Sequence, residues 1–297
     1  MSLFDRLVDE ALRGQGVLAP LRVVVEKELL HHDILREMSE AGLLSQLTFI
    51  GGTCLRACYG SNRLSEDLDF TGGADFSRDQ LAGLRAVLIE RMQDKYGLKV
   101  EVAEPRRDTG DVDTWKLKVV TRPSQRDLPP QRIHIDICAI PSHDRRPRML
   151  RNHYGVDMGT AGLIVQAQSR EEILADKLVA FALRNRIKHR DLWDIAWLKQ
   201  QGVVLPLALL PLKLADHRRG RDEFLLVLDE RSRSLRSQPG LHDEFRQEMR
   251  RFLPAALAAT TVEQGEFWAY ITGLVEDESR RASEWLTGRG TDSPFSM

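Results

Sequence analysis

Residues 51–70 read GGTCLRACYGSNRLSEDLDF. The stretch begins with a glycine pair, continues with a short segment of mixed polarity and ends with acidic residues. The apolar run before them, residues 47–50, predicts a strand that ends in a glycine turn. Residues 53–59 predict a short helix, and Leu68 and Phe70 then alternate with two aspartates as in a half-buried strand. The expected order is strand, turn, helix and acidic strand.

The two aspartates are the first candidates for chemistry. In a strand, Asp67 and Asp69 lie on one face with alpha carbons about 6.6 Å apart, while Leu68 and Phe70 point into the core. Carboxylates held this way converge on one hard cation, or on two about 4 Å apart, and Mg²⁺ (or Mn²⁺) fits oxygen ligands of this kind. A solvated turn is the alternative for an Asp-x-Asp pair taken alone.

A third aspartate follows the same logic. In the segment IHIDICA, Ile133, Ile135 and Ile137 predict the buried face of a strand, and Asp136 faces the other way. A carboxylate inside so apolar a strand needs a partner, because burying an unpaired charge is unfavourable. A metal ion shared with the aspartate pair would supply that partner.

The glycine pair suggests a place for phosphate. Gly51 and Gly52 allow the backbone to approach a ligand closely, and amides there, with the hydroxyls of Thr53 or Ser65, are suited to phosphate oxygens. An ordinary turn is the alternative.

Further candidates lie on two later helices. A capping-box pattern at Ser169 predicts a helix to about residue 183, in which apolar neighbours direct Lys177 toward the protein body. Lys177 would neutralise phosphate charge, or it is a lysine that extends along a helix edge to water. A second helix is expected near Asp191, which is either functional or a helix N-cap, with Asp194 on the same face.

The rest of the chain indicates two domains. We expect a mixed α/β domain with N-terminal helices over residues 1–165, a helical domain that completes the cleft over 166–287, and a flexible tail over 288–297. The mixed domain is expected to hold helices over residues 21–41 and 77–95, and strands over 98–102, 114–121 and 132–139. The pair His31 and His32 is expected on the surface of the first of these helices.

Composition excludes some classes of protein. The 297 residues include 43 basic and 44 acidic side chains, so the net charge of −1 gives no global signal for a polyanionic partner. Three cysteines are too few for a disulfide framework, and neither a signal peptide nor a membrane-length apolar run is present. These features predict a cytoplasmic protein without a membrane partner.

The motifs together resemble a known family. The ordered set GGTCLR, Arg63-x-Ser65-x-Asp67-Leu-Asp69-Phe, IHIDI, EEILADKLVA and RDLWD is similar to the AbiEii/AbiGii nucleotidyltransferase toxins, over roughly residues 24–198. The resemblance implies a DNA polymerase β-type nucleotidyltransferase fold in a bacterial toxin–antitoxin or phage-defence protein. The substrate would be a nucleoside triphosphate, the acceptor an RNA, with the 3′ end of tRNA as the expected example, and a cognate antitoxin is an expected partner.

The resemblance also assigns roles. Gly51, Gly52, Thr53, Arg63 and Ser65 would bind the nucleotide, and Asp67, Asp69 and Asp136 the metal. Lys177 would contact the triphosphate, with Asp191 as an essential acid and Asp194 as its companion.

Three other functions compete with this one. His189-Arg190-Asp191-Leu192 matches the start of a protein-kinase catalytic loop, but Ala196 stands where that loop needs asparagine. A phosphoesterase is disfavoured because no histidine-rich ligand set is present. A catalytically inactive nucleotide- or protein-binding module with the same fold is the remaining alternative. Two clusters of arginine and lysine, at residues 145–151 and 184–190, fit a polyanionic partner and equally fit solvated surface.

Overall fold

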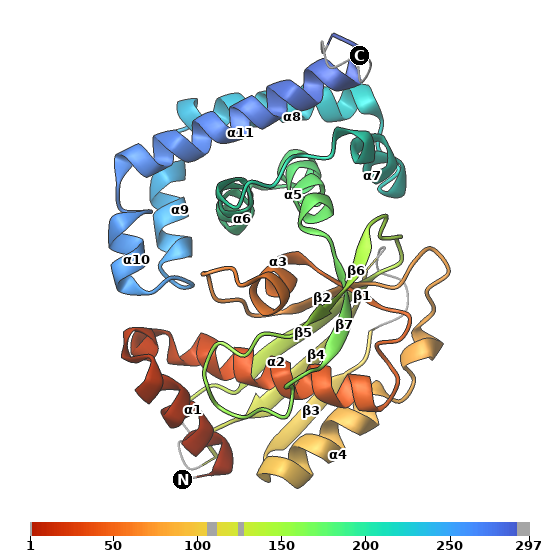
Figure 1. Cartoon of the computed structure of the whole chain (residues 1–297), viewed down its shortest axis with the longest axis vertical. Helices are drawn as coiled ribbons and strands as arrows, with labels where there is room; N and C mark the ends of the chain where they lie inside the picture. The colour runs from red at the N-terminus through yellow and green to blue at the C-terminus, as the bar shows by residue number, and fades with distance from the viewer. Residues whose placement is uncertain (1, 106–111, 124–127, 290–297) are drawn as a thin grey trace. The chain divides into compact units, whose positions relative to one another are not determined.

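The computed structural model describes residues 2–105, 112–123 and 128–289 (Figure 1). The chain divides into two compact units, which are described separately. The sheet unit comprises the chain up to Gln168 together with Phe252–Pro254, and the helical unit comprises Ser169–Arg251 and the chain from Ala255 onward. The expected tail, residues 288–297, lies almost wholly outside the described residues.

A seven-stranded mixed sheet forms the centre of the sheet unit in the described residues, in the order β3-β4-β5-β2-β1-β7-β6. Its strands are β1 (Thr48–Ile50), β2 (Leu68–Thr71), β3 (Lys99–Ala103), β4 (Val112–Val120), β5 (Gln131–Cys138), β6 (Arg145–Met149) and β7 (Ile164–Gln168). Strand β2 runs parallel to β5, and β1 runs parallel to β7, whereas the other neighbours are antiparallel. The mixed α/β architecture expected from the sequence, a mixed sheet with helices packed on it, is confirmed.

Alternating burial explains the two central strands. Leu68, Phe70 and the three isoleucines of β5 are at most 1% exposed, while the residues between them are less buried. Phe49 of β1 stacks on Phe70 with ring centroids 5.1 Å apart. Burial of these side chains fixes which face of each strand carries the aspartates.

Helices cover this sheet. They are α1 (Leu3–Gly14), η1 (Gly16–Leu21), α2 (Arg22–Glu40), α3 (Gly51–Cys54), η2 (Leu55–Tyr59), η3 (Arg78–Leu81) and α4 (Leu84–Tyr96). Helix α2 packs on β5 and α4, α4 packs on β3, and α3 packs on β2. The prediction of one helix over residues 77–95 was wrong, because Ala82 and Gly83 separate η3 from α4. Strands β6 and β7 were not predicted.

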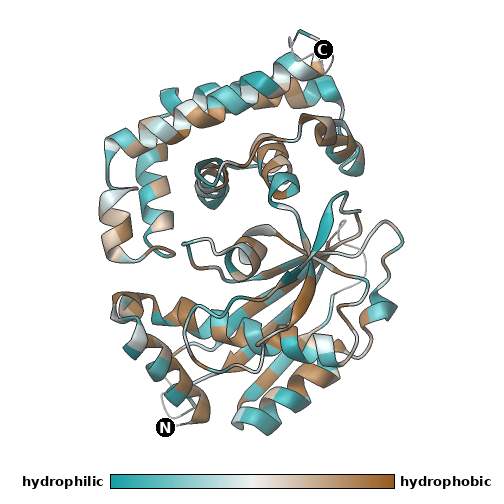
Figure 2. Ribbon diagram, in the orientation of Figure 1, coloured by the Kyte–Doolittle hydropathy of each residue, from teal (hydrophilic) through white to brown (hydrophobic). Residues whose placement is uncertain are grey.

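The helical unit is built from seven α-helices in its described residues. They are α5 (Arg170–Leu183), α6 (His189–Gln200), α7 (Leu210–Asp216), α8 (Arg221–Ser237), α9 (Leu241–Met249), α10 (Ala255–Thr260) and α11 (Gly265–Leu286), with η4 (Leu207–Leu209) before α7. Helix α5 packs against α6, α7 and α8, and α11 packs against α6 and α8. Helices α8 and α11 carry hydrophilic and hydrophobic residues side by side, as amphipathic helices do (Figure 2). None of the described helices has the length and apolar character of a membrane span.

The segment Phe252–Pro254, between α9 and α10, belongs to the sheet unit. Phe252 is 1% exposed, and its carbonyl oxygen accepts a hydrogen bond of 2.9 Å from the amide of Leu64. The chain therefore leaves the helical unit once, contributes to the sheet unit, and returns.

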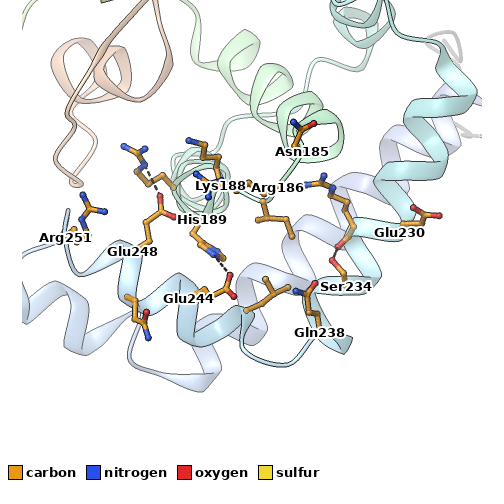
Figure 3. A pocket seen from close by; sticks show the side chains of 15 residues that line it. Asn185, Arg186, Lys188, His189, Glu230, Ser234, Gln238, Glu244, Glu248 and Arg251 are labelled. Atoms are coloured by element: carbon orange, nitrogen blue, oxygen red, sulfur yellow. Dashed lines mark hydrogen bonds and ion pairs between the residues drawn. The ribbon is translucent and has the colours of Figure 1, made fainter. Parts of the chain in front are cut away.

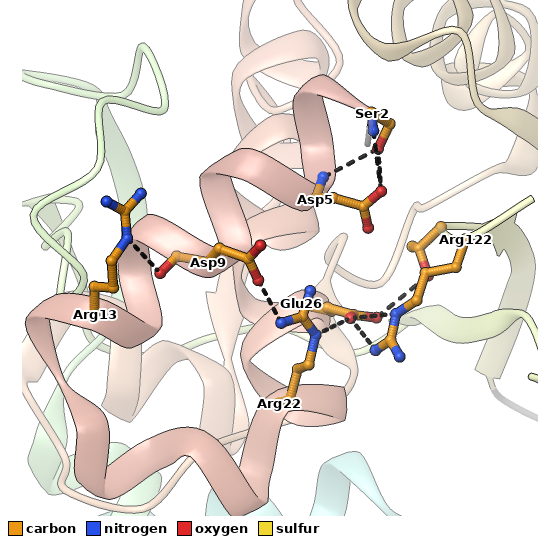
Figure 4. Close-up of polar contacts among 8 residues, drawn as sticks. Ser2, Asp5, Asp9, Arg13, Arg22, Glu26 and Arg122 are labelled. Atoms are coloured by element: carbon orange, nitrogen blue, oxygen red, sulfur yellow. Dashed lines mark hydrogen bonds and ion pairs between the residues drawn. The ribbon is translucent and has the colours of Figure 1, made fainter. Parts of the chain in front are cut away.

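A buried carboxylate ties α2 to the far ends of β4 and β5. Glu26 is 1% exposed, and it accepts from the guanidinium groups of Arg22 and Arg122 (Figure 4). It also accepts from the Thr121 hydroxyl at 3.2 Å and the Gln131 amide at 2.7 Å. Three of these four donors lie outside α2, at the end of β4 and the start of β5, and they fix the position of the helix over the sheet.

Removing this carboxylate should weaken the sheet unit. We expect Glu26→Ala to lower the free energy of unfolding by about 2–3 kcal/mol, because the Arg122 guanidinium loses its counter-ion and the Thr121 and Gln131 donors lose their acceptor, although Arg22 keeps Asp9. Urea unfolding followed by far-UV circular dichroism measures the change. The matched control is Glu101→Ala, an exposed carboxylate that contacts Lys99 and Lys118 at 3.1 Å each, for which no change beyond error is expected. Equal effects of the two substitutions would contradict the structural role of Glu26.

Candidate active site

The register of the sheet brings two predicted carboxylates together. Asp69 of β2 is the direct partner of Asp136 of β5 in the parallel pair, so their alpha carbons lie about 4.8 Å apart across the two strands. Their side chains share one face, because Leu68 and Phe70 on β2 and the isoleucines of β5 occupy the other. The sequence predicted that each aspartate lies opposite the buried face of its strand. The structure adds that the two strands are neighbours.

Asp67 lies next to the same two strands, but it is held there by a side-chain hydrogen bond rather than by strand pairing. It precedes β2, and its Oδ1 accepts a hydrogen bond of 2.9 Å from the backbone N–H of His134 on β5. The imidazole Nδ1 of His134 lies 3.6 Å from the same oxygen. The side chain of Asp67 is 34% exposed, so it is fixed at one oxygen and open to solvent or ligand on one side.

Gly51 lies directly against one of these carboxylates. Its φ of +75° favours glycine, and a Cβ at this position would come within 2.8 Å of Asp69 Oδ2. Helix α3 begins at Gly51, so the glycine pair is the start of the helix rather than a turn before it.

Gly52 is needed for a different reason, which is the close approach of an arginine. A Cβ on Gly52 would come within 2.0 Å of Arg63 Nη2. Arg63 is 3% exposed, and its Nη1 donates to the carbonyl oxygen of Leu64 at 3.1 Å. The structure therefore gives Arg63 a packing role at the glycine pair.

Thr53 and Ser65 hold the segment that leads into β2. Their hydroxyl groups are 2.6 Å apart, and Thr53 also donates to the carbonyl oxygen of Asp67. Both residues are buried. Their observed contacts are thus with the acidic segment itself.

Glu28 of α2, which the sequence analysis did not identify, binds the backbone of the acidic segment at Ser65. It is 5% exposed, and its Oε1 accepts from the amide of Ser65 at 2.8 Å. Its Oε2 accepts from Arg56 at 3.1 Å and from the hydroxyl of Tyr154. A glutamate in a helix otherwise rich in buried apolar residues was the signal that could have identified it.

The prediction that the histidine pair lies on the surface was wrong. His31 and His32 are 3% and 6% exposed, because α2 is buried between the sheet and other helices on more than one side. His31 Nε2 lies 3.0 Å from the carbonyl oxygen of Glu66, and His32 Nδ1 lies 2.9 Å from the hydroxyl of Thr160. His31 therefore helps to support the acidic segment, whereas His32 fixes α2 to the loop that contains Thr160.

The helical unit brings together its own three predicted residues. Lys177 Nζ lies 2.6 Å from Asp191 Oδ1 and 2.8 Å from Asp194 Oδ2, and Arg184 donates to the second oxygen of Asp191. Lys177 is 9% exposed, Asp191 3% and Asp194 0%. Lys188 is the N-cap of α6, so Asp191 is not the cap but lies in the first turn. Lys177 is directed inward, as predicted, and is balanced by two carboxylates.

The sheet carboxylates fit a cation. Asp136 Oδ1 is buried and has no hydrogen-bond partner among the described residues, and such an oxygen is stabilised by a positive charge. Across the described ranges no group of three or more His, Cys, Asp or Glu side chains is already arranged as a metal site. The donors are therefore of the right type for a hard cation, and Asp69 and Asp136 are the pair already side by side.

The site thus combines acidic side chains on neighbouring strands with a helix that begins at a glycine pair. The family model described as nucleotidyl transferase AbiEii toxin, type IV TA system, matches residues 33–272, and the chain belongs to that family.

Two solved structures from Helicobacter pylori are similar to the chain. One, assigned as a nucleotidyltransferase, has 16% identity and a TM-score of 0.47, covering 89% of this chain and 98% of its own. The other, JHP933, has 15% identity and a TM-score of 0.45, covering 88% and 97%. No curated protein matches the sequence.

The buried histidines predict how stability depends on pH. Burial lowers the pKa of His32 to about 4, and it also lowers the pKa values of His31 and His153. Above pH 6.5 both folded and unfolded states hold neutral imidazoles. As the pH falls below 6.5 the unfolded state binds protons first, so stability is lost down to about pH 4, by roughly 3 kcal/mol for His32.

Unfolding free energies measured between pH 7.5 and 5 test this expectation. His32→Gln should flatten the loss of stability on acidification, whereas His217→Gln, at an exposed position in the helical unit, should not. A wild-type protein that is equally stable at pH 7.5 and pH 5 would contradict the burial argument.

Proposed function

We propose that this protein is a metal-dependent toxin that transfers nucleotides from a nucleoside triphosphate to an RNA acceptor, with the 3′ end of tRNA as the expected acceptor. The observation that carries the proposal is the pairing of Asp69 with Asp136 beside Gly51, in a chain of the AbiEii family. Membership of that family supports a nucleotidyltransferase toxin. The aspartates on β2 and β5 are the proposed site of nucleotide transfer.

The acidic residues have a common task in this proposal. Asp67, Asp69 and Asp136 would hold Mg²⁺ or Mn²⁺, and Asp136 Oδ1, which has no partner in the described residues, is also suited to accept the proton of the attacking hydroxyl. A bound divalent cation supplies Lewis acidity and offsets negative charge on the phosphorus centre and the departing pyrophosphate.

Residues around the carboxylates would position the nucleotide. Gly51 leaves space beside Asp69 that any side chain would fill, so the triphosphate can approach there. Thr53 and Ser65 keep Asp67 in place through their hydroxyl contacts, and Arg63 supports Gly52. We therefore propose that these three act on nucleotide binding by supporting the segment rather than by exposed contacts.

The helical unit contributes the second proposed group. Lys177 would contact the triphosphate as a point charge. Both oxygens of Asp191 are engaged, one by Lys177 and one by Arg184, and Asp194 holds Lys177 from the other side. We propose that the two aspartates orient this lysine, and that Asp191 is essential for that reason.

A cytoplasmic location and a role in phage defence follow from the same proposal, because nucleoside triphosphates, RNA and invading phage nucleic acid meet in that compartment. The family's place in type IV toxin–antitoxin systems supports a cognate antitoxin as a partner.

Loss of either paired carboxylate should abolish the reaction. Purified protein is incubated with each labelled nucleoside triphosphate, MgCl₂ and total RNA, and incorporation is measured. We expect Asp69→Asn and Asp136→Asn to lower the rate at least about 1000-fold, because each removes a charge that holds the cation. Asp75→Asn, at an exposed position after β2, is the matched control and should retain full activity.

Two outcomes would contradict the proposal. Undiminished incorporation by Asp69→Asn would remove the acidic site. Metal-dependent nucleotide binding by the wild type, without incorporation of any of the four nucleotides, would favour an inactive binding module.

A pair of glycine substitutions separates backbone strain from damage to the site. Gly51→Ala and Gly73→Ala both place alanine at positive φ, +75° and +85°, with a strain of about 1–2 kcal/mol each. Only at Gly51 does the new Cβ meet Asp69, since nothing lies within 4 Å of a Cβ at Gly73. We expect similar losses in thermal stability and about a 100-fold loss of incorporation by Gly51→Ala alone. Equal activities would show that the space beside Asp69 is not used.

A further inference from the structure

The helical unit holds a cavity of about 690 Å³ where the α5–α6 connection, α8 and α9 meet (Figure 3). Five basic side chains line it. They are Arg186, Lys188, Arg190, Arg231 and Arg251. Three glutamates also line it, and two of them are engaged, Glu248 by Arg190 at 3.1 Å and Glu244 by His189 at 3.4 Å. The lining therefore carries an excess of positive charge.

Arg231 is the most informative of these residues. Its Nη2 donates to the backbone carbonyl oxygen of Arg184, while its Nη1 is buried and has no partner among the described residues. Burial lowers the pKa of Arg231. A buried N–H group without an acceptor is unfavourable, and a bound anion would supply the acceptor that Nη1 lacks.

His189 gives a second, independent indication. It is 5% exposed and lines the cavity, yet its Nδ1 has no hydrogen-bond partner within the described ranges. It is also the first residue of α6, a 12-residue helix whose first turn has no side-chain cap, so uncapped amides lie at the same place. Backbone amides at a helix start favour an anion.

The lining distinguishes among anions. It contains guanidinium, ammonium and imidazole groups, and no aromatic ring other than that of His189. Single-stranded bases are usually held by stacking on aromatic rings, whereas arginine forks and lysines bind phosphate oxygens. The cavity is therefore suited to a phosphate group and offers little to a base.

The cavity is also linked to the proposed catalytic lysine. Arg231 contacts the backbone of Arg184, the Arg184 guanidinium holds Asp191, and Asp191 holds Lys177. Arg184 would therefore connect a phosphate bound at Arg231 to the Lys177 group, which consists of Lys177, Asp191 and Asp194.

We propose that this cavity binds a backbone phosphate of the RNA acceptor. The inference rests on the proposed function, since it concerns the substrate that receives the nucleotide. A free nucleotide offers the same phosphate chemistry, and the experiment separates the two sources.

Charge reversal tests the proposal. Arg186→Glu/Lys188→Glu changes two cavity residues outside the Lys177 group, and Arg219→Glu/Arg221→Glu changes two exposed arginines elsewhere in the same unit. Binding of fluorescein-labelled tRNA is measured by anisotropy over a series of salt concentrations, and Mg-ATP binding is measured by calorimetry. We expect the cavity variant to bind tRNA about tenfold more weakly or worse, with a smaller salt dependence, and to keep its affinity for Mg-ATP. The control variant should bind tRNA within about twofold of wild type.

A second variant addresses Arg231 itself. Arg231→Gln removes the charge and keeps an amide donor for the Arg184 carbonyl oxygen, so weaker tRNA binding with an unchanged thermal unfolding temperature is expected.

The remaining outcomes overturn the inference. If the wild type incorporates nucleotide and the cavity variant binds tRNA as tightly as the wild type, the cavity is not a phosphate site. The proposed function would then remain. Weakened Mg-ATP binding with unchanged tRNA binding would assign the cavity to a free nucleotide. A wild type that neither binds tRNA nor incorporates nucleotide would remove both proposals.

Discussion

The parallel pairing of β2 with β5 is the constraint on which the site depends. It places Asp69 beside Asp136, two like charges on adjacent strands. Like charges so close are unfavourable without a cation or hydrogen bonds. Buried apolar residues on the opposite face hold the register, because a shift of one residue would turn Phe70 outward and Asp69 into the core. Hydrophobic burial on one face thus maintains an electrostatic arrangement on the other.

The sequence predicted the parts of this arrangement that follow from periodicity. Alternation of apolar and polar residues in 68–71 and 131–138 predicted the face on which Asp69 and Asp136 lie, whereas Asp67, which was expected on the same strand, precedes it. Strand β6 was not predicted because it reads RRPRM and all five residues are exposed, so no apolar alternation marks it. The interruption at Gly83 was missed because the apolar pattern continues on both sides of it.

Contacts between residues that are distant in the sequence also could not be predicted. The inward direction of Lys177 followed from its neighbours on the helix, but its partners Asp191 and Asp194 lie 14 and 17 positions away and come from another helix. The histidines of α2 were expected on the surface and Glu28 was not identified, because a helix buried on several sides has no single polar face in its sequence. Side-chain identity alone does not specify which long-range partner satisfies a buried polar group.

The excursion of Phe252–Pro254 into the sheet unit has a consequence for synthesis of the chain. Phe252 accepts the hydrogen bond from Leu64, next to the segment that Glu28 fixes at Ser65. Chains fold from the N-terminus as they are made. The ribosome therefore produces α5 to α9 before this hydrogen bond can form, so a nascent chain contains the proposed catalytic aspartates well before this contact to the neighbouring segment exists.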